Sequence, residues 1–408
     1  MEPIHTKGNH FYRGNSRFLI KGISYIPRHI DPENHRSIYS SDTIVDALAD
    51  DRLEELKRDI PIFQELGLNT IQVTGLDPTR SHAKAMHLLA EAGIYVLVEI
   101  GHKIKTPAAS HAGRRMDPNF DTSRYYTLFV MRRAFRIVDQ LADHPNLLAF
   151  TADAEMITSP DMTKMAEVCR AAVRDVKTLL QLRGGRRPPV GVHTSDIAGL
   201  EMSMLQYFTA GPAESRVDFF AKDCYSWASP SDFQMSGWSS MVEAYGRFPV
   251  PMFLAEFGTN INERKWDEIP CLYSPDMTGV YSGGCVYTYF EHGNQYGIAE
   301  IGEGFSVGED GETIGIGERG ERVKKEEFGR LKEGLRMVGE RTSEQLFTEE
   351  VKDYEGWTGT FPAVQGSWHA TANLPDLPAS VEAMYEEIWK EREEQVRGGV
   401  QQLGIENS

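Results

Sequence analysis

Two glutamates follow apolar runs whose length and composition are typical of buried strands. Glu155 comes after NLLAFTADA, and Glu256 comes directly after VPMFLA. Two carboxyl groups about 5 to 5.5 Å apart can cleave a glycosidic bond with retention of configuration, one as proton donor and one as nucleophile. This requires one carboxyl group to be protonated while the other is ionised. The alternative is that both are surface or salt-bridged residues, since the chain holds 60 acidic side chains.

Eight short apolar segments are predicted to be strands, and helical or loop segments separate them. Their hydrophobicity is continuous rather than alternating, which is typical of parallel strands buried on both faces. The segments are 18–25, 69–73, 94–100, 146–152, 189–193, 217–221, 250–255 and 284–290. We therefore expect an α/β fold, a (β/α)8 TIM barrel. A doubly wound sheet is the alternative, but no GxGxxG loop follows the first strand.

The strand count predicts where the two glutamates lie. Residues at the C-terminal ends of barrel strands line the active site. Glu155 and Glu256 follow the fourth and seventh predicted strands, which lie across the barrel mouth from each other. We therefore expect their carboxyl groups to converge.

Three regions are predicted along the chain. Residues 1–301 form the barrel, with helices at 53–66, 82–92, 125–142 and 162–182. Residues 302–323 are rich in Gly and Glu and read as an exposed loop. Residues 324–408 form an acidic C-terminal helical extension packed on the barrel, with helices at 324–338 and 380–396.

The charge balance and motifs exclude several classes of protein. With 43 basic and 60 acidic residues, the formal net charge is −17. So acidic a chain has no overall electrostatic attraction for nucleic acid or an anionic membrane. The sequence holds no apolar run long enough for a transmembrane helix and no GxSxG motif. A neutral partner such as a sugar is compatible with this charge.

The sequence predicts no metal site and no cofactor. His82 and His87 are five residues apart on one predicted helix, so they do not share a face as i, i+4 ligands would. His102 follows the third strand and could line the pocket. Asp153 and Glu155 would share one strand face, but no third ligand lies near them in the sequence.

Several ordered segments make the chain resemble a known family. They include FLIKGISYIP, LGLNTIQV, SHAKAMHLLAEAGIYV, AAVRDVK, PPVGVHTSDI, DCYSW, VPMFLAEFGTN and MTGVYSGGCVYTYFEHGNQYGI. From about Lys7 to Ile301 the chain resembles the fungal β-1,3-glucanosyltransferases of glycoside hydrolase family 72. The resemblance implies a retaining enzyme that acts on β-glucan or a β-linked oligosaccharide. Whether it transfers the sugar, hydrolyses it or does both stays open.

The resemblance also implies roles for single residues. Glu155 corresponds to the acid/base and Glu256 to the nucleophile. The positions expected to bind substrate are Tyr25, Gln72, Asp153, Asp223, Tyr225, Trp227 and Tyr287. For Tyr225, Trp227 and Tyr287 the alternative is packing at the barrel rim.

Departures from the family pattern surround the two glutamates. Ala154 stands where the family has an Asn that bonds the sugar 2-hydroxyl, and Gln72 stands where it has an Arg. Ile26 replaces a Gln, and Asp223 replaces an Asn. Such a site fits an enzyme with altered preference, including a hydrolase of another β-linked glycan. It also fits a weak or inactive carbohydrate-binding relative, and a scaffold acting through the C-terminal helices is a further alternative.

The sequence favours an intracellular location. Cys169, Cys224, Cys271 and Cys285 do not fall on the disulfide positions of the family, and there is no N-glycosylation acceptor. Loss of several disulfides together fits a compartment where thiols stay reduced. The sequence also shows no signal peptide or anchor tail. An extracellular location, as in the family, is the alternative. The oligomeric state cannot be predicted.

Overall fold

Eight parallel strands close into a barrel, as the sequence predicts. The computed structural model describes residues 1–27, 44–101, 120–152, 155–301, 322–347 and 356–405. In barrel order the strands are β4 (Ile20–Ser24), β5 (Thr70–Thr74), β6 (Tyr95–Glu99), β7 (Leu147–Thr151), β8 (Val190–Thr194), β9 (Phe220–Cys224), β10 (Met252–Phe257) and β11 (Tyr281–Val286), after which β11 pairs with β4. The (β/α)8 fold is confirmed.

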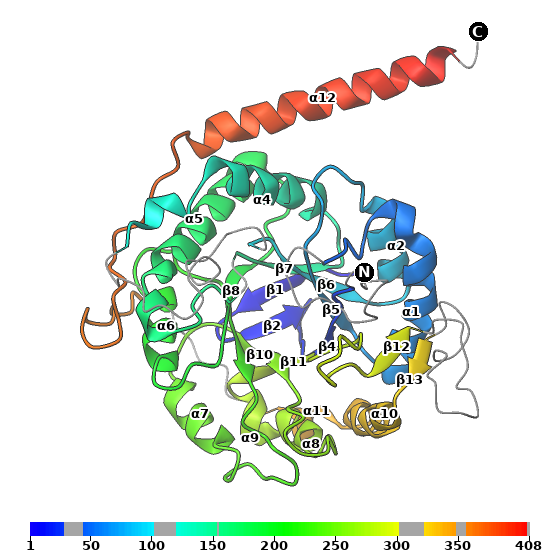
Figure 1. The fold of residues 1–408 in the computed structure, drawn as a ribbon, viewed down its shortest axis with the longest axis vertical. Helices are drawn as coiled ribbons and strands as arrows, with labels where there is room; N and C mark the ends of the chain where they lie inside the picture. The colour runs from blue at the N-terminus through cyan, green and yellow to red at the C-terminus, as the bar shows by residue number, and fades with distance from the viewer. Residues whose placement is uncertain (28–43, 102–119, 153–154, 302–321, 348–355, 406–408) are drawn as a thin grey trace, which may run out of the picture.

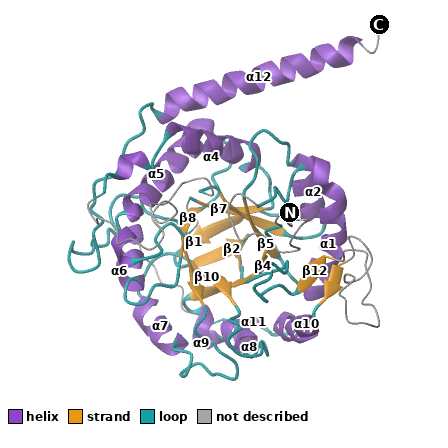
Figure 2. Cartoon of the chain, in the orientation of Figure 1, coloured by secondary structure: helices purple, strands orange, loops and turns teal. Residues whose placement is uncertain are grey.

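Helices surround the barrel and bury its outer face (Figures 1 and 2). They include α1 (Leu53–Leu66), α2 (Ala83–Glu91), α4 (Leu128–Leu141), α5 (Met165–Arg183), α6 (Glu201–Thr209), α7 (Trp238–Tyr245), α8 (Glu268–Leu272) and α9 (Pro275–Thr278). Helix α1 has the predicted bounds and continues through Pro61. It ends where Gly67 adopts a left-handed conformation with φ of 70°, which glycine takes without a steric penalty.

An N-terminal hairpin packs into the barrel interior. It is built from β1 (Ile4–Lys7), β2 (His10–Arg13) and the short β3 (Ser16–Arg17). Ile4 and Phe11 of this hairpin share a buried cluster with inward-facing strand residues such as Leu97, Ala221 and Phe253. The hairpin therefore helps to fill the barrel on the side away from the strand ends that carry the glutamates.

Two strands lie about three residues away from their predicted positions. The sixth strand begins at Phe220 and continues through Lys222 and Asp223, so it is less apolar than expected. The eighth strand begins at Tyr281 and includes two glycines. A Cβ on Gly284 would lie 2.7 Å from the backbone oxygen of Leu254, so the close approach of β10 and β11 requires glycine there.

The C-terminal segments pack on the outside of the barrel. The strands β12 (Ala299–Ile301) and β13 (Arg322–Lys324) form a small antiparallel sheet. Helix α10 (Glu326–Gly339) packs on α1 and α8, α11 (Ser343–Leu346) packs on α9, and α12 (Val381–Ile405) crosses α4 and α5. Figure 1 shows α12 extending beyond the ring of helices.

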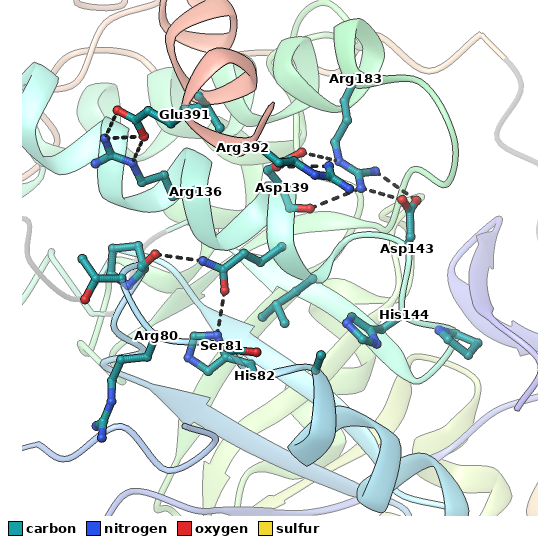
Figure 3. A pocket seen from close by; sticks show the side chains of 17 residues that line it. Arg80, Ser81, His82, Arg136, Asp139, Asp143, His144, Arg183, Glu391 and Arg392 are labelled. Carbon is teal, nitrogen blue, oxygen red and sulfur yellow. Dashed lines mark hydrogen bonds and ion pairs between the residues drawn. The ribbon is translucent and has the colours of Figure 1, made fainter. Parts of the chain in front are cut away.

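Ion pairs and a hollow of about 1000 Å³ lie where α12 meets the barrel (Figure 3). Arg136 donates to both carboxylate oxygens of Glu391, and Arg183 pairs with Asp139 and Asp143. The arginines of this hollow therefore already have carboxylate partners. No described helix is both long and apolar enough to cross a membrane.

One buried carboxylate joins elements from both ends of the chain. Asp59 of α1 accepts hydrogen bonds from the hydroxyls of Tyr25 and Tyr289, at 2.6 and 2.7 Å, and from Nε of Arg322 at 2.6 Å. Breaking a buried ion pair by removing one partner costs about 3 to 5 kcal/mol.

We expect Asp59→Asn to lower the free energy of unfolding by about 3 kcal/mol or more, because Arg322 loses its carboxylate partner. Urea denaturation of the purified protein measures this loss. Glu333→Gln, which breaks an exposed pair with Arg336, is the control and should leave the midpoint unchanged. Equal midpoints for the two variants would contradict this account of Asp59.

Candidate active site

Glu155 and Glu256 meet at the C-terminal end of the barrel. Glu256 is the fifth residue of β10, and Glu155 follows the end of β7 by four residues. These are the fourth and seventh barrel strands, in agreement with the sequence prediction. Both side chains are partly buried, and the negative charge of Glu155 contributes to the raised pKa of Glu256.

The backbone holds Glu155 in an unusual conformation. Its φ of 48° lies in the left-handed region, which costs of order 1 kcal/mol for a residue with a side chain. Its amide donates to the backbone oxygen of His193 at 3.2 Å, and Ser195 Oγ donates to its Oε1 at 3.0 Å. Burial opposes ionisation of Glu155, but the His193 charge and hydrogen bonds with Asp223 and Ser195 outweigh it and lower the pKa.

Glu256 has the opposite shift. Burial and the nearby Glu155 charge raise the pKa of Glu256 to about 7. The Tyr225 hydroxyl donates to its Oε2 at 2.6 Å, which fixes the orientation of the carboxyl group. The opposite shifts of Glu155 and Glu256 favour the proton of the pair on Glu256.

A buried chain of polar groups lies behind the two glutamates. Glu99 of β6 and Asp223 of β9 contact opposite nitrogens of His193, Nδ1 and Nε2, each at 2.6 Å. Gln72 of β5 donates to the same Glu99 oxygen at 2.8 Å. Burial disfavours the charged ring, but the Asp223 charge and the hydrogen bonds to both carboxylates raise the pKa of His193 well above its usual value. Burial also raises the pKa of Asp223 well above its ordinary range.

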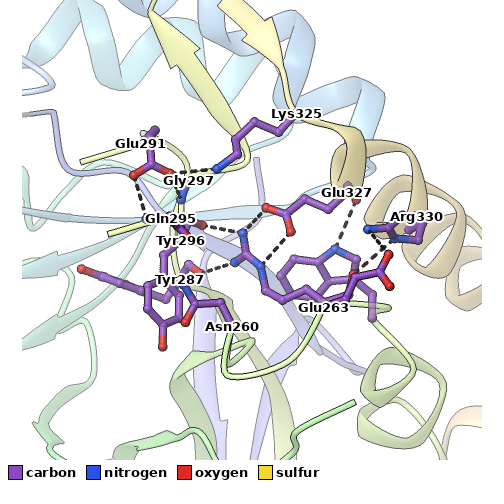
Figure 4. Close-up of polar contacts among 12 residues, drawn as sticks. Asn260, Glu263, Tyr287, Glu291, Gln295, Tyr296, Gly297, Lys325, Glu327 and Arg330 are labelled. Atoms are coloured by element: carbon purple, nitrogen blue, oxygen red, sulfur yellow. Dashed lines mark hydrogen bonds and ion pairs between the residues drawn. The ribbon is translucent and has the colours of Figure 1, made fainter. Parts of the chain in front are cut away.

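Three tyrosines form an aromatic rim beside Glu256. The rings of Tyr225 and Tyr287 lie 6.3 Å apart, and Tyr296 lies 5.8 and 5.2 Å from them. Arg264 holds the backbone of this rim by donating to the oxygens of Tyr287 and Tyr296 at 3.0 and 2.8 Å. Figure 4 shows these two tyrosines and Glu327 of α10. Glu327 of α10 pairs with Arg264, so the C-terminal segment braces the rim.

The structure brings together most of the residues predicted to bind substrate. Gln72 and Asp223 lie in the buried chain, and Tyr225 and Tyr287 lie in the rim. Tyr25 and Trp227 are not brought to this cluster: the Tyr25 hydroxyl bonds Asp59, and the Trp227 ring packs on Trp238 at 4.7 Å and donates to Asp267. The predicted contacts of Asp153, and the replacement at Ala154, lie outside the described residues.

Four residues of the site were not predicted from the sequence: Glu99, His193, Ser195 and Tyr296. Glu99 and His193 each interrupt an otherwise apolar strand near its C-terminal end, in YVLVE and VGVHT. Charged or polar residues at the C-terminal ends of barrel strands often line the active site, so this position could have identified both residues as site candidates. Tyr296 lies in the segment MTGVYSGGCVYTYFEHGNQYGI, which contributes to the family resemblance, but its contact with Tyr225 depends on how the chain folds after β11.

Among the described residues, His193, Asp223 and Glu256 could together hold a metal ion, with one ligand atom each within 4.8 Å of the others. The histidines considered from sequence do not join them. His82 bonds Asp46 and Gln140, and His87 pairs with exposed Glu91. His102 lies outside the described residues.

Comparison with known proteins identifies the family of this chain. The pattern of a family described as glucanosyltransferase, glycoside hydrolase family 72, matches residues 1–311. The chain belongs to glycoside hydrolase family 72. The resemblance predicted from sequence is therefore confirmed.

Two curated relatives and one solved structure show the extent of the likeness. The chain is 38% identical over 296 residues to 1,3-beta-glucanosyltransferase gel1 of Aspergillus fumigatus, covering 72% of this chain and 60% of that protein. It is 32% identical to 1,3-beta-glucanosyltransferase GAS5 of Saccharomyces cerevisiae over 387 residues, or 94% and 71% of the two chains. Gas2p of Saccharomyces cerevisiae in complex with laminaripentaose has a TM-score of 0.74 and 27% identity, covering 93% and 78%.

The shifted pKa of Glu256 predicts how stability changes with pH. A carboxyl group whose pKa rises from about 4.3 when unfolded to about 7 when folded destabilises the protein as pH rises through that range. We expect Glu256→Gln to stabilise the family 72 fold by about 1 to 3 kcal/mol more at about pH 8 than at about pH 4.

Chemical denaturation at both pH values measures this difference. Glu382→Gln, on the exposed face of α12, is the control for loss of a carboxylate. A stabilisation by Glu256→Gln that is equal at the two pH values would contradict the assigned burial and repulsion.

Proposed function

We propose that the chain is a retaining β-glucan-active enzyme of the β-1,3-glucanosyltransferase type. The observation that carries the proposal is the pair Glu155 and Glu256, which meet at the barrel mouth and have opposite pKa shifts. Membership of family 72 supports the same activity. The chain spans about 60% of the length of gel1, so the activity of gel1 supports a proposal for this chain and does not establish its activity.

In the first step the Glu256 carboxylate, oriented by the Tyr225 hydrogen bond, attacks the anomeric carbon. The bond between that carbon and the departing sugar oxygen breaks. Glu155 gives its proton to this oxygen, and Glu256 becomes esterified to the sugar. The product is a covalent glycosyl-enzyme and a shortened chain with a new reducing end.

The free protein favours the proton on Glu256, whereas the first step needs it on Glu155. Asp223 offers a route for the proton to reach Glu155. Its carboxyl group has a pKa raised well above the ordinary range by burial, and it hydrogen-bonds Glu155. The proton that Glu256 loses can therefore pass to Asp223, whose carboxyl group lies within 4.8 Å, and from Asp223 to Glu155. Asp223 ends this transfer as the carboxylate that contacts His193, and the pair of glutamates keeps a single negative charge.

In the second step Glu155 acts as a base. Esterification removes the negative charge of Glu256, which favours ionised Glu155. Glu155 takes the proton of an incoming hydroxyl as that oxygen attacks the anomeric carbon and Glu256 leaves. A sugar hydroxyl gives transfer and water gives hydrolysis. The rim of Tyr225, Tyr287 and Tyr296 offers aromatic surface for an acceptor sugar and supports transfer.

A β-1,3-linked glucan is the substrate class we propose. The Gas2p structure contains laminaripentaose, and gel1 and GAS5 are named 1,3-beta-glucanosyltransferases. The replacements Gln72 and Asp223, which lie in the buried chain, favour the second candidate: a relative with another β-linked substrate or weak activity.

The intracellular location predicted from sequence stays a proposal. The four cysteines are free thiols, which fits a reducing compartment. Family membership favours the extracellular alternative that the resemblance implied.

Incubation with a single β-1,3-gluco-oligosaccharide, read by mass spectrometry, tests the proposed activity. We expect products both longer and shorter than the input, because the glycosyl-enzyme is intercepted by a second sugar chain. Shorter products alone would show hydrolysis.

Glu256→Gln is the matched control, since it keeps the size of the side chain and removes the nucleophile; it should abolish both kinds of product. An unchanged oligosaccharide with the unmodified protein would refute the β-1,3-glucan assignment, and a panel of other β-linked glycans would then separate altered preference from loss of activity.

A further inference from the structure

His193 lies at the centre of the buried charges below the two glutamates. Its ring is 3% exposed, and both ring nitrogens contact a carboxylate at 2.6 Å. The carboxyl groups facing it come from four directions: Glu99 on β6, Glu155 after β7, Asp223 on β9 and Glu256 on β10. The Cys285 thiol on β11 also faces it, and burial raises the pKa of this thiol well above its usual value, so it is neutral.

The ring supplies positive charge to both proposed catalytic groups. The charge of His193 favours the ionised forms of Glu155 and of Glu256. A nitrogen of His193, an oxygen of Asp223 and an oxygen of Glu256 all lie within 4.8 Å of one another. An opposite charge at that distance typically lowers the pKa of a carboxyl group by about 1 to 3 units. β5 contributes neutral Gln72 where the family resemblance places an arginine.

We propose that the His193 imidazolium, clamped between Glu99 and Asp223, is the positioning residue that supplies the positive charge under Glu155 and Glu256. Its use in catalysis rests on the proposed function. In that role His193 stays charged through the cycle and neither gives nor takes a proton. It offsets the repulsion of the two glutamates while Glu256 is the ionised nucleophile.

The geometry explains why the ring can keep its charge although it is buried. Each N–H donates to a carboxylate, and hydrogen bonds between charged groups are short and about twice as strong as neutral ones. Gln72 fixes Glu99 at the far side of the ring. A metal ion at His193, Asp223 and Glu256 is the rival occupant, and a cation bound to the Glu256 carboxylate would compete with its attack on the sugar.

Carbon-13 NMR of the glutamate carboxyl groups tests the proposal without requiring turnover. The Glu256 signal is assigned by its loss in Glu256→Gln, and its titration midpoint is then followed in the full chain. We expect His193→Gln to raise this midpoint by about 1 to 3 units, because the carboxylate loses its nearest cation. An unchanged midpoint would overturn the proposal.

His82→Gln is the matched control. His82 is a buried histidine that also contacts an aspartate, Asp46, at 2.9 Å, and the described contacts of its ring do not include the catalytic pair. We expect it to leave the Glu256 midpoint unchanged. A midpoint raised equally by both variants would show a general loss of packing and overturn the role of His193.

An added arginine tests whether the charge of His193, and not the shape of its ring, sets the Glu256 midpoint. Gln72→Arg, made in the His193→Gln background, returns a cation beside Glu99 and should lower the Glu256 midpoint again. No lowering would overturn the charge explanation. In the active enzyme, His193→Gln should move the acidic limb of the kcat/KM profile upward by the same 1 to 3 units, with a smaller effect on KM.

Two further readouts use the unaltered protein. Nitrogen-15 NMR of histidine should show the His193 ring protonated on both nitrogens above about pH 7, and a neutral ring there would overturn the proposal. A stoichiometric divalent ion whose removal by a chelator shifts the Glu256 midpoint would overturn it in favour of a metal site. A His193-dependent midpoint in a protein that neither transfers nor hydrolyses glucan would refute the proposed function and leave this inference standing.

Discussion

Two carboxylates repel each other, and holding Glu155 and Glu256 together at the barrel mouth costs free energy that the rest of the fold must offset. The repulsion contributes to the raised pKa of Glu256. The closeness of the two carboxyl groups also serves the proposed reaction, because a pair that holds one proton provides an acid and a nucleophile at once. The surrounding residues limit this cost without removing it: His193 supplies charge, while Ser195 and Tyr225 each donate to one carboxylate oxygen.

The barrel makes this arrangement possible because its interior is filled elsewhere. The N-terminal hairpin and inward apolar residues occupy the opposite side, leaving the strand ends for polar groups. The C-terminal segments brace the outside at two points. Arg322 of β13 binds Asp59 of α1, and Glu327 of α10 binds Arg264 behind the tyrosine rim. The extension is thus attached to the wall of the site, although it lies beyond the residues that match the family pattern.

The parts of this architecture that follow from local rules could be predicted from the sequence. Helix α1 has its expected bounds because Gly67 ends it, and the two glutamates fall at the predicted strand ends. The buried chain could not be predicted, because Glu99 and His193 lie on strands that are not neighbours, and their contact depends on barrel closure. The orientation of the aromatic side chains could not be predicted either. The Tyr25 hydroxyl bonds Asp59 of α1, whereas the Tyr225 hydroxyl bonds Glu256.

A covalent intermediate on Glu256 is the central claim, and trapping it is the most direct measurement. A 2-deoxy-2-fluoro-laminaribiosyl fluoride keeps a good leaving group, while its ring fluorine disfavours the positive charge that develops in both steps. Intact mass spectrometry should show one added disaccharide, and peptide mapping should place it on Glu256. No mass increase in a protein that turns over glucan, or a label on Glu155, would contradict the account.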